Sequence, residues 1–155
     1  MISLKRASTS DAELIWKMQV ASFKSLLEKY EDFDTNPGNE PLEYVLARLE
    51  QPFTYFYLIR SDEDTIGAIR VVDTKQAGER KRIAPIFILP EHQGRGFAQQ
   101  AIGLAEEIHG HSNWMLDTIL QEPGNCYLYE KMGYHRTGEQ TVVNEKMTLV
   151  YYHKD

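Results

Sequence analysis

The stretch from Ile83 to His109 most constrains the fold, because an apolar run passes through a short glycine-containing turn into a helical pattern. The run IAPIFIL is typical of a buried strand, and Pro85 is expected near its start, where a missing N–H does least harm. Beyond the turn, apolar residues recur at the spacing of one helix face: Ala98, Ala101, Ile102, Ala105 and Ile108. A second apolar run, WMLDTIL, follows at 114–120. This order predicts a crossover that joins two parallel strands of a mixed sheet.

Two helices are predicted before this unit. Apolar residues at helical spacing indicate a first helix over 11–30, with Ser10 and Glu13 placed as a capping box. The polar cluster EDFDTNPGNEP then indicates a loop. A second helix is expected to begin with Pro41 at its first position and to end before Pro52.

Strands dominate the rest of the pattern. Aromatic and β-branched runs predict a hairpin of strands at 53–60 and 66–73, joined through SDEDT. The segment 125–133 indicates a short helix, and one or two final strands include 147–153. No repeat or linker interrupts the chain, so the expectation is one domain over 1–155, of the α+β class with α/β mixed character.

Composition limits the class of protein. The chain has 155 residues, of which 42% are hydrophobic and 26% charged, as in ordinary globular domains. No apolar stretch approaches the ~20 residues that span a bilayer, and the N-terminal MISLKRASTSD lacks a signal-peptide apolar region, so no membrane association is expected. The lone cysteine, Cys126, excludes an internal disulfide and fits a cytoplasmic location. A net charge of −6 argues against a nucleic-acid partner.

The acidic residues are concentrated in one region. Residues 28–50 contain seven acidic side chains against two basic ones, Lys29 and Arg48. Such a run is commonly a solvated face. It is also compatible with a cationic substrate, because a cleft lined by one sign of charge focuses its field on the opposite sign.

The turn PEHQGRGFA matches neither common nucleotide-binding fingerprint. A dinucleotide motif would require G-x-G-x-x-G/A, and Gly94 and Gly96 are not followed by the third residue of that pattern. No Walker P-loop is present. The glycines allow two interpretations: a plain strand-to-helix turn, or an anion nest in which main-chain N–H groups, a helix N-terminus and the charge of Arg95 hold a phosphate.

Two segments together resemble the GNAT superfamily of N-acetyltransferases. FILPEHQGRGFAQQA resembles the superfamily's motif of a strand followed by Q/R-x-x-G-x-G/A, and CYLYEKMGY at 126–134 resembles its LYEKxGF segment. The expected order of helices and strands matches the superfamily fold over nearly the whole chain. The resemblance implies a central mixed sheet, mostly antiparallel, with a splayed parallel strand pair and about four flanking helices.

The resemblance implies acetyl-CoA as co-substrate and no metal. Its pyrophosphate would lie on the loop made of Gln93, Gly94, Arg95, Gly96, Phe97 and Ala98. Its pantetheine arm would pair with the main chain of Ile86, Phe87 and Ile88, and the Ile88 N–H would polarise the thioester carbonyl. Asn125 is assigned to cofactor contact, with capping of the short helix as the alternative.

The resemblance also assigns the chemistry. Tyr129 matches the tyrosine that protonates the departing thiolate, although packing is the alternative for a tyrosine in this cluster. The general base is left open between Asp117, Glu122 and a water chain, and both carboxylates also have structural interpretations. Tyr55 and Tyr57 either line the acceptor slot or pack.

Further side chains have plain interpretations. His109 and His111 form an H-x-H pair that suits cations at a helix C-terminus better than a metal site. Cys126 has no nucleophile partners and is expected to pack.

The predicted function is transfer of an acetyl group from CoA to an amine of unknown identity, by direct attack in a ternary complex. The acceptor is expected to be a small molecule or a peptide, and a homodimer is possible. A non-catalytic acyl-CoA-binding regulatory module and a plain nucleotide-binding α/β domain are the alternatives.

Overall fold

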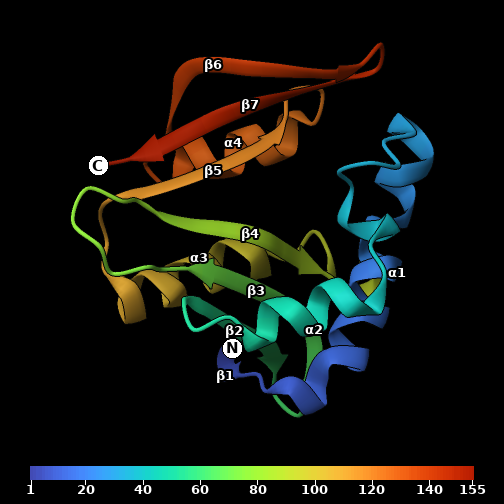
Figure 1. Ribbon diagram of the computed structural model, residues 1–155, viewed down its shortest axis with the longest axis vertical. Helices are drawn as coiled ribbons and strands as arrows, with labels where there is room; N and C mark the ends of the chain where they lie inside the picture. Colours follow the sequence, from blue (N-terminus) through green and yellow to red (C-terminus); the bar gives the residue numbers. More distant parts are fainter.

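A computed structural model describes residues 1–155, which form one seven-stranded sheet flanked by helices (Figure 1). The strand order is β1-β2-β3-β4-β5-β7-β6, and every neighbouring pair is antiparallel except β4 and β5. The strands are β1 (Ile2–Arg6), β2 (Thr54–Ser61), β3 (Asp64–Val72), β4 (Lys81–Ile88), β5 (Trp114–Ile119), β6 (His135–Asn144) and β7 (Met147–Lys154). The α+β class with a mostly antiparallel mixed sheet is therefore confirmed.

Four helices cover the two faces of this sheet. They are α1 (Ala12–Tyr30), α2 (Leu42–Glu50), α3 (Phe97–His109) and α4 (Pro123–Lys131), with three short 3₁₀ turns at Thr9–Asp11, Pro37–Asn39 and Pro90–His92. Helices α1 and α2 lie on one face, and α3 and α4 lie on the other (Figure 1). No helix combines the length and the apolar content needed to cross a bilayer.

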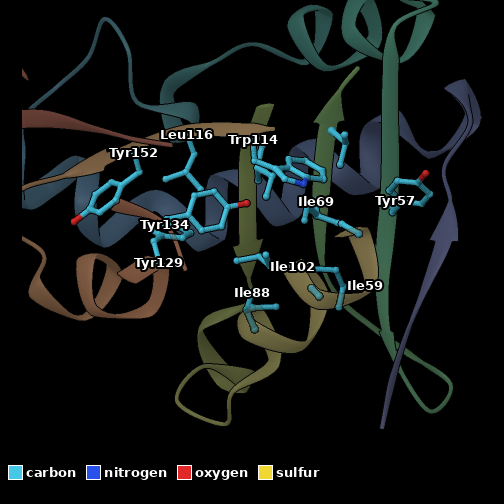
Figure 2. Packing of buried hydrophobic residues seen from close by; sticks show 14 of the residues in the cluster. Tyr57, Ile59, Ile69, Ile88, Ile102, Trp114, Leu116, Tyr129, Tyr134 and Tyr152 are labelled. Carbon is cyan, nitrogen blue, oxygen red and sulfur yellow. The ribbon is translucent and has the colours of Figure 1, made fainter. Parts of the chain in front are cut away.

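The alternation of side chains along the strands divides the core into two layers. On β2, Phe56 and Leu58 pack beneath α1 and α2, whereas Tyr57 and Ile59 face the α3 side. The larger cluster, on the α3 and α4 side, joins both halves of the sheet through Trp114 and several tyrosines (Figure 2). Apolar area buried on both faces stabilises the sheet and holds β4 and β5 as part of one rigid layer.

Several local predictions at the N-terminal end were wrong. Ser10 and Glu13 do not form the capping box; instead, the Ser8 N–H donates to Asp11 Oδ2 at 2.9 Å, because a 3₁₀ turn precedes α1. Pro41 is the N-cap of α2 rather than its first residue. Strand β1 was not predicted, since a five-residue edge strand carries too short a pattern.

The prediction for Pro85 was also wrong: it is the fifth residue of the eight in β4, not near its start. The register between β3 and β4 shifts beside it, so the strand is irregular there. Because Pro85 has no N–H, the ladder loses a donor, and the neighbouring Ala84 carbonyl accepts a hydrogen bond from Arg70 at 2.7 Å instead.

Strands β4 and β5 pair over a very short length. Their only partners are Lys81 with Trp114 and Arg82 with Met115, after which the two strands share no register. Beyond this point β4 is held only by β3, and β5 only by β7. The predicted splayed parallel pair is therefore present, and its open side lies at the C-terminal ends of both strands (Figure 1).

Candidate active site

A cleft of about 1110 Å³ occupies the gap between the splayed strands. Its walls come from α1, β4, the turn before α3, β5 and α4. This volume is at the upper end of the range for small-molecule pockets and suits a long ligand. The cleft crosses the sheet, so one end meets the N-terminus of α3 and the other meets α1 and α2.

The turn before α3 presents main-chain donors to this cleft. Gly94 and Gly96 have φ values of 79° and 78°, a region that glycine enters without strain. No backbone N–H from Gly94 to Gln99 donates a hydrogen bond within the protein, and no side chain caps α3. These free donors and the positive end of the helix macrodipole fit a phosphate group. The residues present therefore suit the pyrophosphate of CoA.

The individual side chains of this loop differ in what they contribute. Gly94, Gly96, Phe97 and Ala98 line the cleft, whereas Arg95 is exposed and lies outside its wall. The Gln93 amide donates to the Ile88 carbonyl at 2.9 Å. Its side chain thus ties the loop to the end of β4.

The three residues predicted to pair with the pantetheine arm do not all direct their main-chain groups to the same side of β4. The Leu89 N–H donates to the Ile66 carbonyl at 2.8 Å, so by alternation Phe87 also points its main-chain groups toward β3. Ile86 and Ile88 therefore direct theirs toward the cleft. The sequence could not distinguish these three residues, because the pairing with β3 decides which residues of β4 use their N–H and C=O groups in the sheet.

Tyr129 lies on the cleft wall opposite β4. It is 8% exposed and packs against Tyr134 and Tyr152 with ring centroids 6.1 and 6.2 Å away (Figure 2). Burial, with smaller effects from Asp117 and Cys126, raises the pKa of Tyr129 to about 12, so the phenol keeps its proton at neutral pH.

The first turn of α4 places Glu122 and Asn125 differently from the sequence interpretation. Glu122 is the N-cap, so the capping alternative for Asn125 is wrong, and Asn125 lines the cleft with its side chain free. Glu122 accepts hydrogen bonds from Lys29, at 2.8 Å, and from Tyr30. Burial opposes ionisation of Glu122, but these two partners outweigh it and lower its pKa.

Asp117 is the other carboxylate that the sequence offered as a base. It projects from β5 toward Arg82, whose guanidinium lies 3.3 Å away. Burial raises the pKa of Asp117, and Arg82 offsets this only in part. The two carboxylates are thus shifted in opposite directions.

Tyr55, Tyr57 and His109 lie away from the cleft. The Tyr57 hydroxyl is 2.8 Å from His109 Nε2, and Asp73 lies 3.4 Å from His109 Nδ1. Burial lowers the pKa of His109, which Asp73 offsets only in part, so the expected C-terminal helix cation at His109 is wrong. His111 is exposed. No three His, Cys, Asp or Glu side chains form a metal-binding group.

The sequence interpretation missed the wall of the cleft beneath α1 and α2. This wall includes Ser22, Phe23, Arg48, Arg70 and Arg82. The residues of α1 have the spacing of ordinary core contacts, so no signal marks them. A charged residue inside the apolar strand IGAIRVV was a usable signal for Arg70.

These features define a class of protein in which a cleft between two diverging strands suits a long phosphorylated ligand. Residues 22–134 match the acetyltransferase (GNAT) family. The chain belongs to this family, and it is an N-acetyltransferase with acetyl-CoA as its acyl donor.

Solved structures with the same fold include several acetyltransferases. A PaiA N-acetyltransferase from Thermoplasma acidophilum in complex with CoA has a TM-score of 0.76 at 17% identity, covering 100% of this chain and 99% of that one. A spermidine N-acetyltransferase from Vibrio cholerae with CoA and spermine has 0.74 at 18% identity, covering 97% and 93%. An acetyltransferase from Thermus thermophilus has 0.72 at 18% identity, covering 98% and 95%. Comparison with curated proteins gave no significant match.

Proposed function

We propose that the protein transfers the acetyl group of acetyl-CoA directly to an amine, with both substrates bound in the cleft at once. The observation that carries this proposal is the cleft itself, which joins free main-chain donors at α3 to an open wall beneath α1 and α2. A ligand that enters from one end of the cleft can meet a second ligand that enters from the other end. Holding two substrates in the right orientation contributes a large part of the rate enhancement of a two-substrate reaction.

The cofactor end uses main-chain groups. The N–H groups from Gly94 to Ala98 bind the pyrophosphate, and the Gln93 amide holds this loop on the end of β4. Ile86 and Ile88 pair with the pantetheine arm, while Phe87 remains bonded to β3. Asn125 contacts the cofactor from the opposite wall.

The reacting end uses one main-chain donor and two side chains. Bound acetyl-CoA supplies the thioester, and the Ile88 N–H donates to its carbonyl oxygen, where negative charge grows during attack. The Tyr129 hydroxyl donates a proton to the leaving sulfur. Asp117 lines the cleft and accepts the proton of the amine, because its raised pKa makes it more basic than Glu122, the other carboxylate considered as a base.

The test is turnover by a Tyr129→Phe variant. We expect kcat, followed as thiol release from acetyl-CoA with an amine panel, to fall by about 100-fold or more, in the range for loss of a general acid. The dissociation constant for CoA should stay within about twofold, because the phenol only touches the reacting atoms.

Tyr134→Phe is the matched control. Its buried hydroxyl has no partner and the ring lies in the same stack, but the residue does not line the cleft. This variant should keep its turnover. Equal kcat in Tyr129→Phe and the wild type would exclude Tyr129 as the acid.

A further inference from the structure

Three arginines lie on the wall of the cleft that faces α1 and α2. Arg70 comes from β3, Arg82 from β4 and Arg48 from α2, so their proximity depends entirely on the tertiary structure. Two of them have a carboxylate partner. Arg48 makes two hydrogen bonds with Glu40, at 2.7 and 2.6 Å, and Arg82 lies 3.3 Å from Asp117.

Arg70 has no carboxylate partner. Its guanidinium donates to the Ala84 carbonyl at 2.7 Å, to Gln51 Oε1 at 3.0 Å and to Thr54 Oγ1 at 3.4 Å, and all three acceptors are neutral. A guanidinium has five N–H donors in a planar fork, so three bonds leave two N–H groups of Arg70 without a partner, and Arg70 lines the cleft.

The electrostatic surroundings of Arg70 are positive. Burial and the charges of Arg48 and Arg82 lower its pKa to about 10, with only Glu40 acting in the opposite direction. The side chain still carries its full charge at neutral pH. A half-buried cation without a counter-ion is unfavourable, and an anion bound beside it would remove that penalty.

The nearby acidic residues do not provide that anion. Glu40 is occupied by Arg48 and Gln19, and Asp32 accepts from Thr35 and from backbone N–H groups of its own turn. Glu122 is bonded to Lys29 and Tyr30. Each of these carboxylates already has donors of its own, so none of them pairs with Arg70.

We infer that the acceptor carries a carboxylate in addition to its amine, and that Arg70 binds this carboxylate. The inference rests on the proposed function. An amino acid or a short peptide carries both groups in one small molecule, and Asp117 and Arg70 line the same cleft.

The experiment compares acids with their neutral counterparts. Common amino acids and dipeptides are each offered with acetyl-CoA beside the corresponding C-terminal amide. Glutamate and aspartate are also compared with glutamine and asparagine. The rate of thiol release gives kcat/KM for each acceptor. Spermidine serves as the cationic acceptor. In parallel, thermal unfolding is followed with each compound in the presence of CoA. We expect at least one acid to exceed its amide by about tenfold or more in kcat/KM, and acids to raise the melting temperature.

Substitutions test whether the preference for acids comes from the arginines on this wall of the cleft. Arg70→Gln should lower kcat/KM for the preferred acid by roughly 10- to 100-fold and leave its amide within about twofold, the range for a charge-assisted hydrogen bond. Arg70→Lys keeps the charge without the fork and should recover only part of the acid preference. Arg60→Gln, on β2 and outside the cleft wall, should change nothing.

The outcomes separate the two proposals. Preference for amides or spermidine, an equal loss for acid and amide in Arg70→Gln, or no turnover and no thermal shift with any acid overturns the carboxylate inference. If Arg70→Gln does not fold, Arg70→Lys decides the matter, because it keeps the charge but loses the planar fork, and an unchanged acid preference in that variant overturns the inference. Failure to bind CoA, or to release its thiol with any acceptor, overturns the proposed function instead.

Discussion

Single residues at the mouth of the cleft are determined by backbone conformation rather than by packing. An added Cβ at Gly94 or Gly96 would meet no atom within 4 Å, so space does not require glycine at either position. Their positive φ values do, because L-residues pay a conformational cost in that region. The glycines of the motif are therefore needed for a backbone conformation, and this conformation directs successive N–H groups to one point.

Substitution of Gly96 and of Gly103 should have opposite effects on stability. Gly96→Ala forces alanine into the left-handed region, and we expect a loss of about 1 kcal/mol with weaker CoA binding. Gly103→Ala lies within α3 with open space around it and should stabilise by about 0.5–1 kcal/mol. Denaturant unfolding and CoA titration measure both. A stabilising Gly96→Ala would contradict the conformational argument.

At the scale of the elements, β4 determines the shape of the site. Its first two residues pair with β5, the Pro85 irregularity interrupts the ladder, and its last residues follow β3 alone. A close approach holds the last segment against β3: an added Cβ at Gly67 would lie 2.1 Å from the Phe87 carbonyl oxygen. The cleft depends on this contact, because β4 can leave β5 only by approaching β3.

Gly67→Ala should therefore damage both stability and cofactor binding. The methyl group must displace the β4 backbone, which we expect to cost about 1–3 kcal/mol, as overpacking does. Displacement toward the cleft should also weaken CoA binding, as measured by calorimetry. Gly103→Ala is the control for the chemical change. Unfolding at the wild-type denaturant midpoint would show that β3 and β4 can separate freely.

At the scale of the whole molecule, the end of α3 is joined to two separate interior strands of the sheet, β2 and β5. His109 packs edge-to-face with Tyr55, Tyr57 and Trp114, and its side chain is 5% exposed. It thus links α3 to β2 and β5 as a neutral ring between a phenol and a carboxylate. Burial, partly opposed by Asp73, keeps its pKa below the unfolded value near 6.5.

Stability should consequently fall as the solution becomes acidic. With a lowered folded-state pKa, the unfolded chain binds the proton first, so the contribution of His109 is complete above its unfolded pKa and is lost as pH falls below about 6.5. Thermal unfolding from pH 7.5 to 5 should show this decline. His109→Gln should flatten it within that range, whereas the exposed His135→Gln should not. An unchanged slope in His109→Gln would assign the decline to other groups.

Much of the fold was predictable because its signals are local. Apolar spacing identified the long helices and the buried strands, and the turn before α3 together with LYEKMGY indicated the family. Edge strand β1 and the irregularity at Pro85 were not predictable, since short or interrupted patterns carry little information. The main-chain groups and the motif tyrosine of the candidate site could be proposed from the sequence and stay predictions, whereas the side chains from distant strands were not proposed.

The sequence by itself determined the class of the protein, its acyl donor and the turn that suits a phosphate, because these depend on residues a few positions apart. Only the tertiary structure decided which main-chain groups of β4 face the cleft, that His109 is a buried neutral ring, and that Arg70 and Arg82 line the same cleft. The physical reason is that strand pairing and burial join residues tens of positions apart. The charge and direction of a side chain follow from those neighbours.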